Sequence, residues 1–475
     1  MSNLPEYRDV AIIGAGIVGT AIARDLSCYD ASCVVLEKNL DVGAETSKAN
    51  SAILHTGFDA PPESLESRLL QKSYQRFRQE TPGLGVAIES VGALLVAWTD
   101  EEASHLQTIQ QKAKENGVTD TRIISTEVLY RREPHLAPGA KAALEVPGES
   151  IVDPFTPVIA FAREAARNGV EFRFRSPLQR VEATREGLCQ LSTPSGAIAA
   201  RYVINAAGLY SDTIDRLFGH EEFKVTPRKG EFILYDKIAR SLLNSIILPV
   251  PTEKTKGMLV CPTVFGNILA GPTADDQDDK SDTSTSAGGL RRVRENAERL
   301  VPELASQPVT AAYAGLRAAT EHRDYQIHFH PDQRYITVGG IRSTGLSGCL
   351  GISAYVIESL REMGFDADRV KDLPNIPSHN LGEMFPRPYC IADQLNLDRE
   401  YGSIVCHCER VSRREIAEAL TGLLPARDIG GLRRRTRAGA GRCQGSHCHA
   451  EIIAEISRAT NRSMEAVLGA NEEHD

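Results

Sequence analysis

Four cysteines near the C-terminus form the densest group of reactive side chains in the sequence. They stand in two close pairs, Cys406 with Cys408 and Cys443 with Cys448, and the remaining six of the ten cysteines are scattered. Disulfides are disfavoured in a reducing compartment, so clustered thiols there indicate metal binding or redox chemistry. Four thiolates suit either a zinc ion or an iron–sulfur cluster. The single residue between Cys406 and Cys408 favours the cluster, because the two cysteines of a zinc-binding pair usually have about two to four residues between them.

A glycine-rich turn near the N-terminus has the pattern of a dinucleotide site. The apolar run 9–14 leads into the turn Gly14 to Gly19, a helix-like stretch follows, and a second apolar run ends at Glu37. In such a strand–turn–helix–strand unit the glycines allow a tight turn and a close approach of the backbone to a pyrophosphate. The helix N-terminus offers unpaired N–H groups, and an acidic residue after the second strand binds a ribose. The pattern predicts dinucleotide binding without separating NAD from FAD.

Three later segments favour FAD. Residues 43–57 are rich in small and hydroxyl-bearing side chains, residues 202–208 form a buried strand that ends in a small-residue turn, and the glycine-rich stretch 339–347 joins a strand to a helix. With the first turn, these segments resemble the glutathione-reductase-type flavoproteins of the D-amino-acid-oxidase superfamily over roughly residues 8–365. Within it, the chain is most similar to glycerol-3-phosphate dehydrogenases and 2-hydroxyglutarate oxidases. The resemblance implies bound FAD.

The resemblance also assigns flavin contacts to individual residues. In that family the stretch after the second strand wraps the flavin, the small-residue turn lies beside it, and the late helix N-terminus faces its pyrimidine end or its pyrophosphate. The backbone of a further strand, 180–182 here, contacts the adenine. The residues predicted to bind FAD are Gly14, Ala15, Gly16, Ile17, Val18, Gly19, Glu37, Lys38, Thr46, Ser47, Asn50, Ser51, Val181, Ala207, Gly208, Gly340, Gly345, Leu346 and Ser347.

Three residues are predicted to handle the substrate. Oxidation of a secondary alcohol needs a base for the hydroxyl proton, and His55 stands where the resembled enzymes place a histidine near the flavin. Arg317 matches the family's arginine that faces an anionic substrate group, and a guanidinium binds carboxylate or phosphate in a bidentate manner. Arg342 is predicted to serve the same anion or to polarise the flavin. A hydrogen-bonded core histidine and structural ion pairs are the alternatives.

The last part of the chain resembles a known iron–sulfur domain. Over about residues 404–455, the cysteine spacing and the stretch RRRTRAGAGRCQG are similar to the bacterioferritin-associated-ferredoxin-like domain. The same module ends the large subunit of anaerobic glycerol-3-phosphate dehydrogenases. The resemblance implies a [2Fe–2S] cluster on Cys406, Cys408, Cys443 and Cys448, with zinc as the alternative. The nearby arginines would offset the negative charge of such a cluster.

These features predict an α/β protein with a glutathione-reductase-type, Rossmann-like FAD domain, an α+β substrate cap and a small iron–sulfur domain. The length of 475 residues allows about three domains. The expected ranges are 1–80, 151–215 and 331–370 for the FAD domain, 81–150 and 216–330 for the cap, 371–403 for a linker, 404–455 for the [2Fe–2S] domain and 456–475 for a C-terminal tail.

The predicted activity is oxidation of a small anionic secondary alcohol, with electrons leaving FAD through the cluster. sn-Glycerol 3-phosphate is the expected substrate and dihydroxyacetone phosphate its product. L-2-hydroxyglutarate, or another 2-hydroxy acid or polyol phosphate, is the alternative substrate, and a non-catalytic electron-transfer subunit is the alternative role. A redox partner subunit or a quinone-linked acceptor is expected. The net charge of −9 argues against nucleic-acid binding.

No signal peptide and no apolar stretch long enough to span a membrane is evident in the sequence. We therefore expect a cytoplasmic protein, and leave open peripheral membrane association through a partner.

Overall fold

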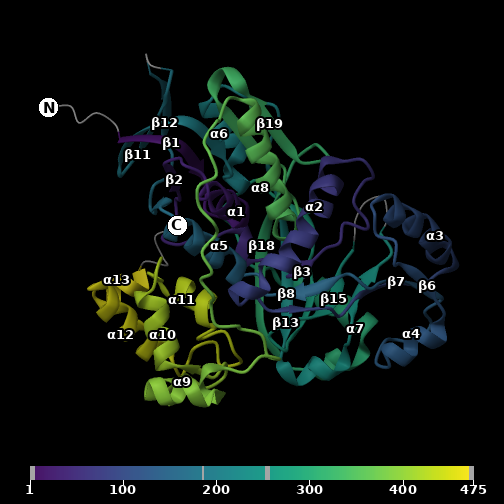
Figure 1. The fold of residues 1–475 in the computed structure, drawn as a ribbon. Coiled ribbons are helices and arrows are strands. Elements are labelled where there is room, and N and C mark those ends of the chain that lie inside the picture. The colour runs from purple at the N-terminus through teal and green to yellow at the C-terminus, as the bar shows by residue number, and fades with distance from the viewer. Residues whose placement is uncertain (1–5, 185–186, 252–256, 470–475) are drawn as a thin grey trace.

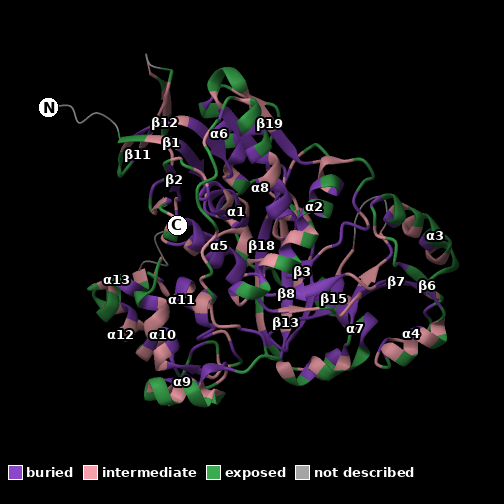
Figure 2. Cartoon of the chain, in the orientation of Figure 1, coloured by how far each residue is buried: buried purple, intermediate pink, exposed green. Residues whose placement is uncertain are grey.

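Two large β-sheets and a small C-terminal module make up the structure (Figure 1). The computed structural model describes residues 6–184, 187–251 and 257–469. Buried residues follow the strands of both sheets, whereas the peripheral helices α3 (Asp100–Glu115) and α4 (Thr126–Arg132) carry many exposed residues (Figure 2). Within the described ranges, no helix has the length and apolar character needed to cross a membrane.

The first sheet is built around β1 (Glu6–Ile13), whose last four residues are buried. This strand pairs in parallel with β2 on one side and with β12 on the other. A parallel strand covered on both faces is expected to be a continuous apolar run, which explains the sequence VAII. The eight strands are β1, β2 (Cys33–Leu36), β9 (Glu171–Arg173), β10 (Arg180–Ala183), β11 (Cys189–Thr193), β12 (Gly196–Asn205), β19 (Gln326–His330) and β20 (Tyr335–Gly339).

Four helices share one buried apolar cluster with strands of this sheet. They are α1 (Ile17–Leu26), α2 (Leu65–Glu80), α5 (Thr156–Arg167) and α8 (Gly345–Glu362). Helix α1 lies against α5 and α8, and α8 lies against α2. A second apolar cluster joins strands of the sheet, β11 among them, to α6 (Ser211–Leu217). The sheet is therefore covered on both faces, as an open α/β sheet requires.

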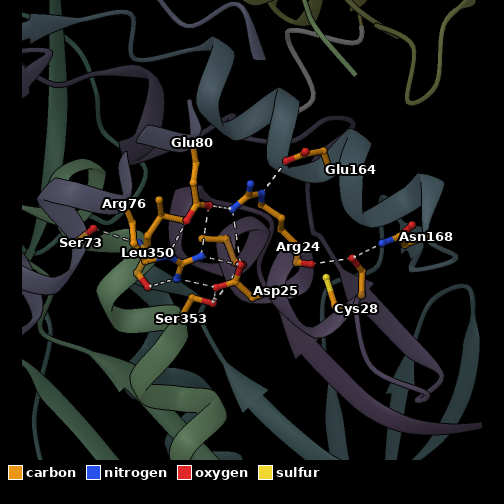
Figure 3. Close-up of polar contacts among 12 residues, drawn as sticks. Arg24, Asp25, Cys28, Ser73, Arg76, Glu80, Glu164, Asn168, Leu350 and Ser353 are labelled. Atoms are coloured by element: carbon orange, nitrogen blue, oxygen red, sulfur yellow. Dashed lines mark hydrogen bonds and ion pairs between the residues drawn. The ribbon is translucent and has the colours of Figure 1, made fainter. Parts of the chain in front are cut away.

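A partly buried ionic network connects three of these helices (Figure 3). The guanidinium of Arg24 on α1 lies 2.6 Å from the carboxylate of Glu164 on α5 and 2.5 Å from that of Glu80 on α2. Arg76 on α2 reaches Asp25 on α1 at 3.1 Å. The network lines a surface cavity of about 720 Å³. Because these charges are paired with one another, we interpret the network as a structural one that holds together the helices covering the sheet.

The second sheet has nine strands, and its longest pairing is between β13 and β18. Helix α7 (Ala287–Leu300) packs on β13 and β16. A three-stranded sheet of β3 (Ile53–Leu54), β4 (Ile88–Glu89) and β8 (Ser150–Val152) stands beside it. The nine strands are β5 (Ala93–Ala97), β6 (Arg122–Ile124), β7 (Ala142–Val146), β13 (Thr226–Tyr235), β14 (Ile246–Pro249), β15 (Leu259–Pro262), β16 (Ile268–Gly271), β17 (Asp275–Asp276) and β18 (Val309–Ala319).

The C-terminal module has its own small core. Its elements are β21 (Ile404–Cys406), β22 (Val411–Ser412), α10 (Arg413–Thr421), α11 (Ile429–Thr436), α12 (His449–Thr460) and α13 (Met464–Gly469). Ser412 and Glu415 form a capping box that starts α10. Ile416, Ile452 and Val467 are fully buried in the core. A short helix, α9 (Ala392–Leu397), lies in the segment before it.

Two elements cross the domain bounds expected from the sequence. Strand β19 lies in the range 216–330 expected for the cap, yet it pairs with β20 in the first sheet. Helix α12 runs past residue 455, and Val467 of α13, in the expected tail, is buried with the module's core. The apolar residues at helical spacing after residue 455 were the sequence signal for this longer module, because such a pattern is typical of a helix that buries one face.

Candidate flavin, substrate and iron–sulfur sites

The first glycine turn is closed tightly against the end of β12. Gly14 has a φ of +102°, and a Cβ there would lie 2.6 Å from the carbonyl oxygen of Ala206. A Cβ at Gly19 would lie 2.0 Å from the carbonyl oxygen of Gly14. Both positions therefore require glycine, and the turn brings the N-terminus of α1 close to the carboxyl ends of β1 and β12. This is the geometry that a pyrophosphate-binding turn needs.

Glu37 stands directly after β2 and faces this turn. Its buried carboxylate accepts hydrogen bonds from the amides of Ala15 at 2.7 Å and Asn39 at 2.8 Å. Burial raises the pKa of Glu37 in spite of these bonds. The Nζ of Lys38, the next residue, lies 2.8 Å from Glu45 and 4.5 Å from the ring centre of Tyr210. The predicted ribose-binding carboxylate is thus in contact with the predicted pyrophosphate turn.

The segment 46–51 lies between the glycine turn and β18. The Oγ of Ser47 accepts a hydrogen bond from the amide of Ile17 at 3.0 Å. The hydroxyl of Thr46 donates to the carbonyl of Leu316 on β18 at 2.8 Å. The side chain of Asn50 holds the segment's own backbone, donating to the carbonyl of Ser47 at 2.9 Å. Ser51 is partly buried at the end of this segment. The structure therefore brings the second predicted flavin segment against the first.

The small-residue turn after β12 reaches the same edge of the sheet. The amide of Ala206 donates to the carbonyl of Ile13 at 2.9 Å, and Gly208 has a φ of +55°. Ala207 and Val181 both pack against the apolar cluster that contains Ile13. Val181 itself lies on β10, which is separated from β1 by two strands, β11 and β12.

The N-terminus of α8 completes this edge. Gly340 follows β20 with a φ of +66°, and Gly345, Leu346 and Ser347 form the first turn of α8. The Oγ of Ser347 donates to the carbonyl of Ile53 at 3.2 Å and accepts from the amide of His55 at 2.8 Å. The helix thereby places β3 and His55 beside the late glycine-rich stretch.

His55 is held by a carboxylate that the sequence did not reveal. Its Nδ1 lies 2.9 Å from Oε2 of Glu149, whose other oxygen accepts from the amide and the hydroxyl of Thr56 at 2.7 and 2.8 Å. Glu149 is completely buried and immediately precedes β8. Its partners are some 90 residues earlier in the chain, and no local spacing marked it.

Arg317 lies on β18, one residue after the carbonyl that binds Thr46. Its guanidinium donates to the carbonyl of Thr273 at 3.3 Å. Burial, with help from the neighbouring charge of Arg228, lowers the pKa of Arg317 to about 10. In the described part of the chain, no carboxylate forms an ion pair with it. The nearest carboxylate that acts on it, Asp276, is paired with Arg228 at 2.6 Å. A desolvated cation without an ion-pair partner of its own is suited to bind an anion from outside.

Arg342 has a different environment. Its guanidinium donates to the backbone carbonyl of Arg323 in an exposed position. This contact occupies part of the fork that would bind a substrate anion, so its predicted role rests on the resemblance alone.

The four C-terminal cysteines converge on one loop region. Cys406 ends β21 and Cys448 immediately precedes α12. The thiol of Cys408 is a hydrogen-bonding neighbour of Cys443, and that of Cys448 a neighbour of Cys406. All ten cysteines are free thiols, so none of the four is committed to a disulfide.

Backbone amides point at these sulfur atoms. The amide of Gly439 donates to Sγ of Cys406 at 3.4 Å. A hydrogen bond from the amide of His447 lowers the pKa of the Cys443 thiol, and a second from the amide of Gly445 lowers it further. Amide donors stabilise thiolates and the negative charge of a thiolate-ligated cluster. The donor set and its surroundings therefore fit a [2Fe–2S] cluster.

The iron–sulfur module is fixed to both sheets by ion pairs. Asp41, just before the flavin segment, lies 2.7 Å from Arg434 and 2.5 Å from Arg435 of α11. Burial would raise the pKa of Asp41, but the two guanidinium groups hold it below its usual value. On the side of the second sheet, Arg442 binds Asp236, the residue after β13, at 2.7 and 2.8 Å. The module thus contacts the loop that leads into residues 46–51, the segment predicted to bind the flavin.

Comparison with known proteins identifies the families of the N-terminal and C-terminal regions. The model of the FAD dependent oxidoreductase family matches residues 9–359. The chain belongs to this family. The model of the BFD-like [2Fe-2S] binding domain matches residues 404–467. The protein is therefore an FAD-dependent oxidoreductase with a C-terminal [2Fe–2S] domain, which confirms the predicted cofactors and enzyme class.

Several members of the FAD dependent oxidoreductase family are similar to this chain. The glycerol 3-phosphate dehydrogenase of Caloramator mitchellensis is 35% identical over 462 residues, covering 96% of this chain and 95% of the relative. The glycerol 3-phosphate oxidase of Mycoplasma pneumoniae is 29% identical over 73% of this chain and 93% of its own. The human mitochondrial L-2-hydroxyglutarate dehydrogenase is 29% identical over 56% of this chain and 60% of its own.

A solved structure shares the fold. The dithionite-reduced L-α-glycerophosphate oxidase of Mycoplasma pneumoniae with FAD bound aligns with a TM-score of 0.72 and 27% identity. The alignment covers 78% of this chain and 98% of that structure. The predicted α/β flavoprotein fold is thereby confirmed, and the predicted similarity to glycerol-3-phosphate dehydrogenases with it. The contacts assigned to single residues, and the domain bounds, stay predictions.

Proposed function

We propose that this oxidoreductase oxidises sn-glycerol 3-phosphate to dihydroxyacetone phosphate. The observation that carries the proposal is Arg317, a desolvated cation with no carboxylate partner among the described residues, placed next to the predicted flavin segment. A phosphate group matches the fork of a guanidinium. The relative that is similar over nearly the full length of the chain is a glycerol 3-phosphate dehydrogenase.

In the proposed reaction, Arg317 binds the substrate phosphate and His55 removes the hydroxyl proton. Bound FAD supplies the hydride acceptor. Because Nδ1 of His55 is engaged by Glu149, the neutral ring carries its basic lone pair on Nε2. The buried carboxylate also stabilises the imidazolium that forms when the proton arrives. Glu149 is thus a positioning residue for the base.

Cys406, Cys408, Cys443 and Cys448 would hold the [2Fe–2S] cluster, which supplies one-electron transfer to an external acceptor. Docking of the module through Asp41 supports a path from the flavin side of the molecule. The acceptor would be a redox partner subunit or a quinone-linked chain, and any contact with a membrane would come through that partner.

The test is anaerobic reduction of the purified holoprotein, followed by its absorption spectrum. We expect glycerol 3-phosphate to bleach the flavin band and then the broader cluster absorption. Bleaching by L-2-hydroxyglutarate alone would reject glycerol 3-phosphate and establish the alternative substrate, whose carboxylates would also bind Arg317. If neither compound, nor any other hydroxy acid or polyol phosphate, bleaches the flavin, the chain would be a non-catalytic electron-transfer subunit.

A further inference from the structure

We propose that His220, Glu222 and His330 form a binding site for a divalent transition-metal ion of the zinc type, separate from the flavin and iron–sulfur sites. His220 and Glu222 lie in the loop after α6, and His330 ends β19 (Figure 1). These elements are more than 100 residues apart in sequence. Only the fold brings the three side chains together.

The three side chains are close enough to share one ion. One ligand atom from each residue lies within 4.8 Å of those of the other two. The rings of His220 and His330 are stacked with centroids 3.6 Å apart, and Oε2 of Glu222 lies 3.7 Å from Nε2 of His330. Ligands about 2.1 Å from a tetrahedral zinc are about 3.4 Å from one another. Movements of roughly 1 Å would therefore complete the coordination.

A buried nitrogen without a hydrogen-bond partner points to a missing ligand. Nε2 of His330 is buried, and no described residue forms a hydrogen bond with it. Buried polar atoms in proteins are nearly always satisfied, and an ion is one of the few explanations for an exception. A cation between the imidazoles and the carboxylate would satisfy this nitrogen and neutralise Glu222.

The surrounding residues hold the ligands in place. Nε2 of His220 lies 2.7 Å from the side-chain oxygen of Gln333, whose amide donates to the carbonyl of Phe218. This contact leaves the other ring nitrogen of His220 for the ion, the arrangement usual in metal sites. Nδ1 of His328, on the same face of β19 as His330, lies 3.6 Å from the same carboxylate oxygen of Glu222.

The donor set indicates the kind of ion. Two imidazoles and one carboxylate favour zinc or a similar transition metal over calcium and magnesium, which prefer oxygen ligands only. Water would fill the fourth position. His330 lies at the end of the β19–β20 pair opposite to Gly340, since it pairs with Tyr335 at the start of β20. The ion would therefore tie the loop after α6 to an edge strand of the first sheet rather than act on the substrate.

The first experiment measures zinc binding to the holoprotein by equilibrium dialysis and elemental analysis. Protein fully loaded with iron is used, because empty cysteine sites would also take zinc. We expect one zinc per chain in the wild type and in the control His105→Ala, which removes an exposed histidine of α3. In His220→Ala and His330→Ala, the affinity for zinc should fall at least about 100-fold, more than loss of an orienting partner costs.

A second measurement keeps the test valid if His330→Ala does not fold. Glu222 is exposed, so Glu222→Gln should leave the fold intact. Zinc should raise the thermal unfolding midpoint of the wild type and of His105→Ala but not that of Glu222→Gln, because an ion stabilises only the state that binds it. Equal zinc affinity in the wild type, Glu222→Gln and His220→Ala, or no zinc bound by the wild type, would overturn the proposal.

Discussion

The contact between Glu149 and His55 gives the sharpest prediction about catalysis. In Glu149→Gln the side chain keeps its size, but one of its oxygens is replaced by an NH₂ group that can only donate. If this group faces His55, the ring must accept at Nδ1 and carry its proton on Nε2, where the base is needed. The substitution therefore removes a charge and also favours the wrong tautomer of the ring.

The size of the effect follows from the geometry. At the 2.9 Å separation of Nδ1 and Oε2, an imidazolium–carboxylate pair is worth about 6 kcal/mol at an effective dielectric constant of about 20. The proton is only partly transferred in the transition state, so we expect about half of this, roughly 3 kcal/mol, to be lost. At about 1.4 kcal/mol per factor of ten, kcat should fall by at least about 100-fold. This lies within the range of about 10²–10⁴ for general base catalysis.

The assay is the rate of flavin bleaching by glycerol 3-phosphate, measured by stopped-flow absorbance over a range of substrate concentrations. KM should change little, because Glu149 does not bind the phosphate. Glu133→Gln is the matched control: Glu133 is also buried and accepts from the amides of Asn244 and Ser245 at 3.0 and 2.7 Å, but it lies at the end of α4, in the range expected for the cap. Folded Glu149→Gln protein that retains kcat within about threefold of the wild type would refute the role given to Glu149.

Three further predictions concern the anion site, the docked module and the cluster. Arg317→Met should raise KM for glycerol 3-phosphate about 10–100-fold with normal FAD content, since a hydrogen bond to a charged group is worth about 1.5–3 kcal/mol; an unchanged KM would remove Arg317 from the anion site. The side chain of Arg442 lowers the pKa of Asp236 from 3.8 to about 2, so the stability from this pair is complete above about pH 4 and is lost as pH falls towards 2. Asp236→Asn should therefore flatten the decline of unfolding free energy in this window, and an identical decline in both proteins would show that Asp236 does not contribute. Cys448→Ser should lose iron but keep FAD, so that substrate still bleaches the flavin while reduction of a one-electron acceptor slows, whereas full iron content in this variant would contradict the ligand assignment.

The sequence predicted those parts of the molecule in which chemistry and spacing are local. The glycines of the turn Gly14 to Gly19 lie within a few residues of one another, and so do the two members of each cysteine pair. Both patterns can therefore be recognised as local sequence motifs. The position of Glu149 against His55 depends instead on the pairing of β3 with β8, and tertiary pairing has no local spacing rule. The same holds for the docking of Arg435 on Asp41 and for the histidines of the proposed metal site. Such contacts become visible only when distant segments are placed side by side.

The domain bounds were also beyond local patterns. The extent of the iron–sulfur module is decided by Val467, whose burial depends on how α13 folds back on α12. Strand β19 lies in the range 216–330 expected for the cap, but it pairs with β20 and is therefore part of the first sheet. A strand's sheet is chosen by its hydrogen-bonding partner, and alternating sequence does not name that partner.

The interleaved order of the first sheet has a consequence for how the enzyme is made. Strand β1 pairs with β12, and β12 pairs with β20, which is far later in the sequence. Most of the chain must therefore leave the ribosome before all strands of the sheet can pair. Such long-range pairing is slow and leaves strand edges open in the meantime. The predicted FAD contacts extend from Gly14 to Ser347, so the complete binding site forms only late in synthesis. Bound FAD will therefore stabilise only the fully paired sheet. A cell short of flavin should therefore yield less folded enzyme, not merely a pool of intact apoprotein that waits for its cofactor.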